Sequence, residues 1–125
     1  MTITTALALP QPWLDLLLAG DAVWHLRPEP THRRGRIAVY DTATGAVVGM
    51  VTLTGTGSHL DLDELRATFR LHRVPPEEAG NSRVPWHMRA AQRLPEPVPC
   101  PALPDADGFV ALDPVTRDRL AELTW

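Results

Sequence analysis

The sequence lacks lysine entirely, and all 12 of its basic residues are arginine. The guanidinium group is planar, permanently charged and able to form two parallel hydrogen bonds, so arginine suits the recognition of phosphates and bases. It does not release its proton near neutral pH, which makes it a poor general base and a poor nucleophile. The basic residues therefore favour binding over proton-transfer chemistry.

Cysteine and long apolar runs are also scarce. The one cysteine, Cys100, cannot form an internal disulfide, and it has no histidine or cysteine nearby at metal-ligand spacing. There is no run of about 18 apolar residues, so we expect no membrane span. The first residues lack the basic start and apolar core of a signal peptide. We therefore expect a cytoplasmic protein without a membrane partner.

Metal and cofactor motifs are missing as well. Five histidines are scattered along the chain without H-x-x-x-H or H-E-x-x-H spacing. His59 together with Asp61 and Asp63 could indicate a metal site, but acidic residues are also favoured at the start of a helix. We expect no metal and no cofactor. With 125 residues and an apolar content of 44%, residues 1–125 are expected to form one domain with one core.

The net charge of −3 argues against a generally basic nucleic-acid-binding protein. The arginines nevertheless fall into two blocks, residues 25–40 and residues 66–93. The first block holds Arg27, Arg33, Arg34 and Arg36, and the second holds Arg66, Arg70, Arg73, Arg83, Arg89 and Arg93. If the blocks meet in space, they form a local positive patch. Alternatively, they pair with the flanking acidic residues in surface salt bridges of little energetic value.

Residues 11–27 hold the most informative pattern in the chain. Pro12 suits the first turn of a helix, and leucines crowd one side of the two turns that follow. Gly20 suits the left-handed conformation that commonly ends a helix. Residues 23–27 then alternate as a half-buried strand does. A helix that leads at once into a strand leaves a crevice between them, whose edge would carry Gln11, Trp13, His25 and Arg27.

The remaining segments are mostly short strands. We expect strands at residues 3–8, 36–40, 46–54, 84–91 and 108–112, the late strand placing Trp86 and Met88 in the core. A helix is expected at residues 61–70, capped by Ser58 or by Asp61, with Glu64 three residues after Asp61. A second helix is expected after Asp113. Many short strands with few helices favour a small barrel over a parallel sheet.

The order of these segments resembles the ASCH domain family, whose fold is similar to that of PUA domains. Residues 11–27 read Q-P-W, an apolar helix and G-x-x-x-x-x-x-R, similar to the family's opening RQPWAxxIxxGxKxxExR. Residues 34–40, 45–51 and 86–99 resemble its R-G-x-hydrophobic strand, its G-x-I-V-G strand and its late strand with a proline-rich exit. The resemblance covers about residues 7–112. It implies an α+β fold, a small mixed PUA-like β-barrel flanked by short helices.

The resemblance also implies a function, the binding of RNA or a nucleotide in the crevice between the first helix and the barrel. Trp13 would stack a base there or pack the helix onto the barrel. Arg27 would hold a phosphate or a carboxylate, or else form a stabilising salt bridge. His25 would transfer a proton, or act only as a hydrogen-bonded strand residue. The candidate ligand-binding residues are Gln11, Trp13, His25, Arg27, Arg33, Arg34, Arg36 and Arg83.

A second hypothesis is an enzyme. Some relatives of the ASCH fold are amidohydrolases acting on acylated cytidine, and some have been described as ribonucleases. The amidohydrolases use a lysine and a threonine, whose positions here are Ala22 and His25. Alanine can neither donate a proton nor act as a nucleophile, so the sequence argues against this activity. A hydrolase acting on a modified nucleoside or on RNA would have to use His25 or His87 instead.

A third hypothesis is a protein-interaction module. Residues 94–104 contain five prolines in eleven residues, which predicts an extended, loop-like segment. Such a segment would bind a protein partner, and its deletion would abolish the capture of that partner.

Overall fold

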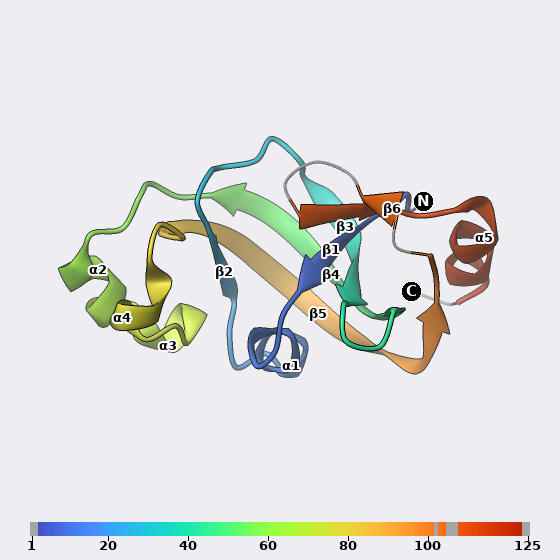
Figure 1. Cartoon of the computed structure of the whole chain (residues 1–125), viewed down its shortest axis with the longest axis horizontal. Coiled ribbons are helices and arrows are strands. Elements are labelled where there is room, and N and C mark those ends of the chain that lie inside the picture. The colour runs from blue at the N-terminus through green and yellow to red at the C-terminus, as the bar shows by residue number, and fades with distance from the viewer. Residues whose placement is uncertain (1–2, 102, 105–107, 124–125) are drawn as a thin grey trace.

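The computed structural model describes residues 3–101, 103–104 and 108–123, and its centre is a curled seven-stranded sheet (Figure 1). The strands follow the order β2-β5-β4-β3-β1-β7-β6. They are β1 (Thr5–Leu9), β2 (Trp24–Arg27), β3 (Gly35–Asp41), β4 (Ala46–Thr56), β5 (Val84–Pro99), β6 (Leu103–Pro104) and β7 (Phe109–Ala111). Strands β1 and β3 are parallel, and the other neighbours are antiparallel. The expected α+β fold, a small mixed barrel-like sheet flanked by short helices, is confirmed.

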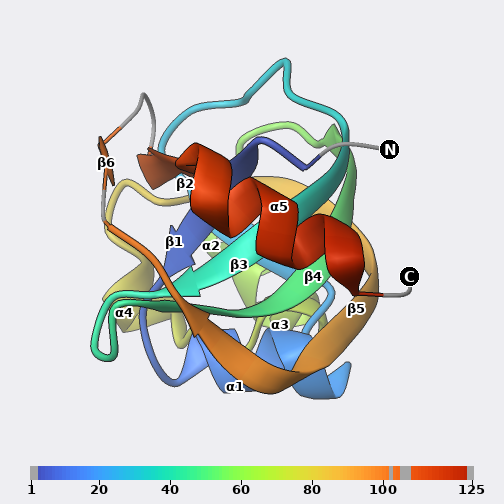
Figure 2. The same ribbon diagram turned by 90° about the vertical axis from the view of Figure 1, so that its right-hand side faces the viewer.

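Short helices surround this sheet. They are α1 (Trp13–Ala19), α2 (Leu62–Ala67), α3 (Phe69–His72), α4 (Pro76–Ala79) and α5 (Pro114–Glu122). Helices α2, α3 and α4 gather beyond β2 at one end of the molecule, and α5 lies at the opposite end (Figure 1). Figure 2 shows α5 lying across the sheet, on the other side from α1. None of the helices in the described part of the chain has the length and apolar character to cross a membrane.

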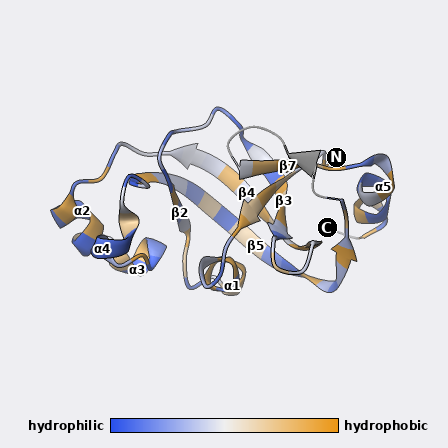
Figure 3. Cartoon of the chain, viewed as in Figure 1, coloured by the Kyte–Doolittle hydropathy of each residue, from blue (hydrophilic) through white to orange (hydrophobic). Residues whose placement is uncertain are grey.

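The central strands bury both of their faces. Alternate residues of a strand point to opposite sides, so in β3 Val39 joins a cluster with Leu14 of α1, whereas Tyr40 joins a cluster with Leu120 of α5. This double burial explains why residues 46–51 of β4 are almost continuously apolar. Hydrophobic stretches on β4 and on α1 are visible in Figure 3. A third cluster joins Leu26 of β2 to α2 and α4.

Helix α1 packs unusually close to β4, and a glycine makes this approach possible. A Cβ atom at Gly49 would lie 2.5 Å from Cδ2 of Leu18 and 2.8 Å from the carbonyl oxygen of Gln92. Gly20 ends the helix in the left-handed conformation, with φ of 82°, as the sequence predicted. Two glycines thus determine where α1 lies and where the chain turns into β2.

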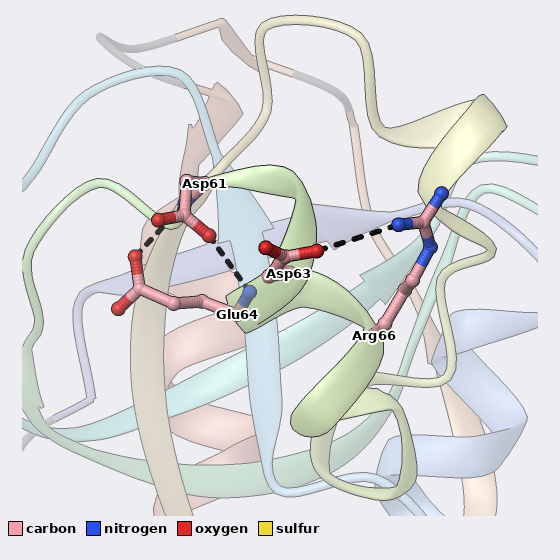
Figure 4. Close-up of polar contacts among 4 residues, drawn as sticks. All are labelled: Asp61, Asp63, Glu64 and Arg66. Atoms are coloured by element: carbon pink, nitrogen blue, oxygen red, sulfur yellow. Dashed lines mark hydrogen bonds and ion pairs between the residues drawn. The ribbon is translucent and has the colours of Figure 1, made fainter.

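The predicted helix at residues 61–70 is correct at its start but divided near its end. Asp61 accepts a hydrogen bond from the main-chain N–H of Glu64, whose carboxylate accepts one in return from the N–H of Asp61 (Figure 4). The exposed pair of Asp63 and Arg66, 3.5 Å apart, adds little stability. At Thr68 the hydroxyl donates to the carbonyl of Glu64, and the chain turns into α3. The turn brings α3 and α4 alongside β2.

The loop predicted at residues 94–104 is wrong for its first half, because β5 continues to Pro99. The N–H of Cys100 donates to the carbonyl of Gly45, and Val98 lies opposite Val47 in register. In an antiparallel ladder alternate residues bond to the same neighbour, so the nitrogen atoms of Pro97 and Pro99 point away from β4. A missing N–H costs no ladder hydrogen bond there, which is why the prolines are compatible with the strand.

Candidate functional site

A pocket of about 210 Å³ opens between the start of α1, strand β2 and helices α3 and α4. It is lined by Pro10, Trp13, Trp24, His25, Leu26, Arg27, His72, Val74, Glu78, Ala79 and Ser82. Trp13, His25 and Arg27 are three of the eight residues that the sequence nominated, and they come from the segment in which a crevice was expected. Gln11, Arg33, Arg34, Arg36 and Arg83 do not line this pocket.

All four residues of β2 border the pocket. Successive side chains of a strand point to opposite faces, so a pocket that touches every residue in a row lies over the edge of the strand. Strand β2 is indeed the last strand in the sheet order, with β5 as its one neighbour. The pocket therefore covers the outer edge of the sheet and is closed on both sides by helices.

Two indole rings contribute to the pocket walls. The Nε1 atom of Trp13 donates to the carbonyl of Arg73, 3.4 Å away, which connects α1 to the end of α3. Trp24 stacks on His87, with ring centroids 5.2 Å apart and planes inclined by 26°. Both indoles are half-buried. Trp13 thus packs the helix and lines the pocket at the same time, so the two roles weighed for it are compatible.

His25 is held neutral inside the pocket. Its Nε2 atom is buried and has no hydrogen-bond partner among the described residues. The ring meets Trp86 edge-on, with centroids 6.1 Å apart. Burial, and to a lesser degree the charge of Arg27, lower the pKa of His25 to about 3. The unpartnered Nε2 leaves hydrogen-bonding capacity in the neutral imidazole, but a pKa so far below 7 makes it a weak general base at neutral pH.

Arg27 begins a stack of four side chains that the sequence did not predict. Its guanidinium carbon lies 5.5 Å from the ring centroid of Trp86. Trp86 stacks on Phe109 at 5.7 Å, and the guanidinium of Arg33 lies 4.4 Å from the Phe109 ring. Cation–π contacts at both ends stabilise the stack. A Cβ atom at Gly108 would come within 2.7 Å of Nη2 of Arg27, so a glycine there leaves room for the guanidinium.

Arg36 is engaged within the sheet. Its guanidinium donates to the hydroxyl of Thr52, the carbonyl of Ala90 and the side chain of Gln92, at 3.1, 2.6 and 3.2 Å. Burial lowers the pKa of Arg36 from its ordinary value. In register, Arg36 lies opposite Thr52, which lies opposite Arg89. The two arginine blocks therefore meet across β4, among residues that do not line the pocket.

The side chains of the other nominated residues form hydrogen bonds with residues one to four positions away in the sequence. The side chain of Gln11 accepts from the N–H of Asp15 at 3.2 Å. Arg34 donates to the carbonyls of Thr31 and Arg33, and Arg83 donates to the carbonyl of Gly80 at 2.9 Å. These contacts order their own loops and leave Arg27 as the nominated arginine that lines the pocket.

Several lining residues were missed because they come from residues 72–82, which showed no clear pattern. His72 is fully buried, and its Nδ1 atom accepts from the N–H of Val74 at 2.9 Å. Its Nε2 atom then carries the proton and donates to the carbonyl of Leu65 at 3.1 Å. Burial lowers the pKa of His72, although this last bond raises it. His72 is thus a neutral structural residue, whereas Glu78 and Ser82 add polar groups to the pocket.

The described residues contain no group of three or more histidine, cysteine or acidic side chains placed to hold a metal ion. No family model and no curated protein sequence matches the chain.

Solved structures do match. The crystal structure of ASCH from Zymomonas mobilis aligns with a TM-score of 0.73 at 15% identity, covering 97% of this chain and 95% of that chain. Two mutant ZmASCH proteins align with TM-scores of 0.70 and 0.71 at 16% and 15% identity. Each covers 97% of this chain, and 96% and 98% of their own chains are covered. At this level of identity the likeness concerns the fold: the chain adopts the fold of ASCH domains.

Proposed function

We propose that the pocket over the edge of β2 binds a single base of RNA or of a nucleotide. The observation that carries the proposal is the meeting of two indoles, a neutral imidazole and a guanidinium in one pocket, from Trp13, Trp24, His25 and Arg27. Aromatic walls with a few polar groups are typical of sites for planar ligands. Its volume of about 210 Å³ is below the ~300–1,000 Å³ common for drug-sized ligands. The pocket therefore suits one base rather than a larger group.

Each group has a role in this proposal. The indole of Trp13 lies against the base, and stacking of this kind contributes roughly 1–3 kcal/mol per base. His25 supplies a hydrogen-bonding nitrogen without a charge. Arg27 supplies the positive charge for a phosphate at the rim, because guanidinium binds phosphate oxygens in pairs. Glu78 in the lining and the net charge of −3 oppose contacts to a long phosphate chain.

Binding should consequently depend only weakly on salt. For single strands, log K falls against log[salt] with a slope of about −0.7 for each phosphate contacted. One contact through Arg27 predicts a slope of about −0.7. A multiply contacted RNA would give a much steeper slope.

The test measures the binding of a labelled single-stranded RNA at low and at moderate salt. We compare the wild type with Arg27→Ala and with Arg34→Ala, whose guanidinium bonds within its own loop. The proposal predicts that Arg27→Ala weakens binding and Arg34→Ala does not. Thermal unfolding of each variant separates loss of binding from loss of the stack on Trp86. No binding of the RNA at low salt, or equal loss in both variants, would contradict the proposal.

The geometry gives less support to a hydrolase. His25 has a pKa of about 3, which is poorly matched to proton abstraction at neutral pH. His25 lies opposite Trp86 and His87 lies opposite Trp24 in the β2–β5 pair, so the two histidines lie on opposite faces. Ala22 is buried and does not line the pocket. Release of product from acylated cytidine, abolished by His25→Ala, would restore the enzyme hypothesis.

A further inference from the structure

The main chain of β2 has a second side, which pairs with no other described strand. The N–H of Met88 donates to the carbonyl of Val23 at 2.8 Å, and the N–H of Gly57 donates to the carbonyl of Pro85 at 2.9 Å. Residues in an antiparallel pair alternate between hydrogen-bonded and non-hydrogen-bonded positions. The carbonyl of Val23 is thus directed at Met88 of β5, and two residues further on His25 lies opposite Trp86 in a hydrogen-bonded position. The carbonyl of Pro85 faces β4, which agrees with this alternation.

The main-chain groups of Trp24 and Leu26 therefore point away from β5. Pro85 lies opposite Leu26 in register and has no N–H to offer. Strand β2 is the last strand of the sheet on this side, and all four of its residues border the pocket. Two N–H groups and two carbonyls of the strand edge thus face the pocket. Main-chain polar groups that are left without a partner are costly, so this edge bonds either to water or to a ligand in the pocket.

We propose that this main-chain edge, rather than an arginine side chain, reads the ligand. The inference rests on the proposed function and specifies its chemistry. The ligand is an unpaired base whose Watson–Crick edge, with its adjacent donors and acceptors, bonds to the main chain of Trp24 and Leu26. Its ring lies against Trp13, and the buried Nε2 of His25 lies alongside. Paired bases are rejected, because their Watson–Crick edge is already used.

An extended peptide is another way to satisfy a strand edge. Here, however, the N–H of Val23 already donates to the carbonyl of Leu71 at 2.8 Å, so α3 blocks the edge immediately before Trp24. The open edge is four residues long and lies in a pocket of about 210 Å³ between helices. A small planar ligand fits this space better than an added strand does.

The experiment measures amide hydrogen exchange of the full chain by NMR. The exchange rates are compared in the free protein and in the presence of each of the four ribonucleoside 5′-monophosphates. In the free protein, the ladder amides of His25 and Arg27 should exchange slowly, and the edge amides of Trp24 and Leu26 should exchange faster. At a nucleotide concentration about ten times Kd, the edge amides should slow by about tenfold. The ladder amides act as the internal control and should change much less.

A methylated nucleotide sharpens the test. For the base that binds, the derivative methylated on its Watson–Crick edge, for example N3-methyluridine 5′-monophosphate, should bind at least about tenfold more weakly, the equivalent of one lost hydrogen bond. If a nucleotide shifts the pocket resonances but leaves exchange at Trp24 and Leu26 unchanged, this inference is wrong and the proposed function stands. If none of the four nucleotides binds, both are wrong. If a peptide alone protects the edge amides, the ligand class is wrong.

Discussion

The centre of the sheet and its β2 edge differ in whether their polar groups have hydrogen-bond partners. In the centre, strands β1, β3 and β4 have a neighbour on each side, and apolar clusters cover both faces. Arg36, which enters this region, has three hydrogen-bond partners. At the edge, the Nε2 of His25 is buried without a partner among the described residues, and Trp24 and Leu26 line a pocket. The first region supplies most of the buried apolar contacts, and the proposed binding site lies in the second.

Two tryptophans give the sharpest contrast between the regions. Trp86 is fully buried, and its Nε1 atom donates to the carbonyl of Glu29 at 2.8 Å. We expect Trp86→Ala to lower the free energy of unfolding by about 3–5 kcal/mol, because it leaves a large cavity. Trp13→Ala removes a half-buried ring, so it should reduce the free energy of unfolding by less than Trp86→Ala does. It should, however, abolish most of the affinity for the base. Denaturant unfolding and nucleotide titration of both variants measure this; similar stability losses would remove the contrast.

A glycine tests how tightly the centre is packed. Gly49→Ala places a Cβ atom against Leu18 and the carbonyl of Gln92, so we expect a loss of about 1–3 kcal/mol, typical of overpacking. Gly55→Ala is the matched control in the same strand, because its nearest neighbour, Nδ1 of His87, is 3.9 Å away. The difference in unfolding midpoint between the two variants is the measurement. Equal midpoints would mean that α1 does not depend on its close approach to β4.

The pH dependence of stability probes the edge. The pKa of His25 is about 3 in the folded protein and near 6.5 unfolded. Between these values the unfolded state binds more protons, so stability falls as the pH falls from about 6.5 towards 3. His25→Gln should remove about 1 kcal/mol of the acid sensitivity by pH 5.5. His59→Gln, at an exposed histidine, should not. The measurement is the free energy of unfolding of each protein at pH 7 and at pH 5.5. An equal loss of stability in the wild type and in His25→Gln would contradict a neutral His25 in the folded protein.

The smallest expected effect concerns helix α2, whose Leu65 packs with Ala79 of the pocket helix α4. Asp61→Ala removes the capping bond to the N–H of Glu64, which should cost about 1 kcal/mol. Asp63→Ala removes only an exposed ion pair with Arg66 and should cost less than about 0.5 kcal/mol. Thermal unfolding of the two variants gives the comparison, and a larger loss for Asp63→Ala would show that the cap is not what holds α2.

Features that depend on neighbouring residues were predictable from the sequence. The helix before Gly20, the capping box at Asp61 and the strand that carries His25 all follow from local periodicity and cap chemistry. The placement of Trp13, His25 and Arg27 in one pocket follows from the same local turn. These residues are close in the chain, so no distant contact was needed to bring them together.

Features that depend on distant partners were not predictable. Arg33 and Arg36 were nominated as ligand-binding residues. Their contacts with the ring of Phe109 and the carbonyl of Ala90 could not be predicted, because these partners are distant in the sequence. The prolines after Leu94 suggested a loop. The strand register that accommodates them is set by pairing with β4, which is distant in the sequence, so it could not be predicted. The open main-chain edge at Trp24 and Leu26 leaves no mark in the residue types at all.

The most direct test of the contrast is an NMR titration of the full chain with the four ribonucleoside 5′-monophosphates, recording the backbone amide resonances of the non-proline residues. We predict that at least one nucleotide shifts the resonances of the pocket, among them Trp13, Leu26 and Val74, while those of the central strands around Val39 and Met50 stay in place. Shifts confined to the surface around Arg36 and Arg89, or no shifts with any nucleotide, would contradict the claim that the β2 edge is the binding region.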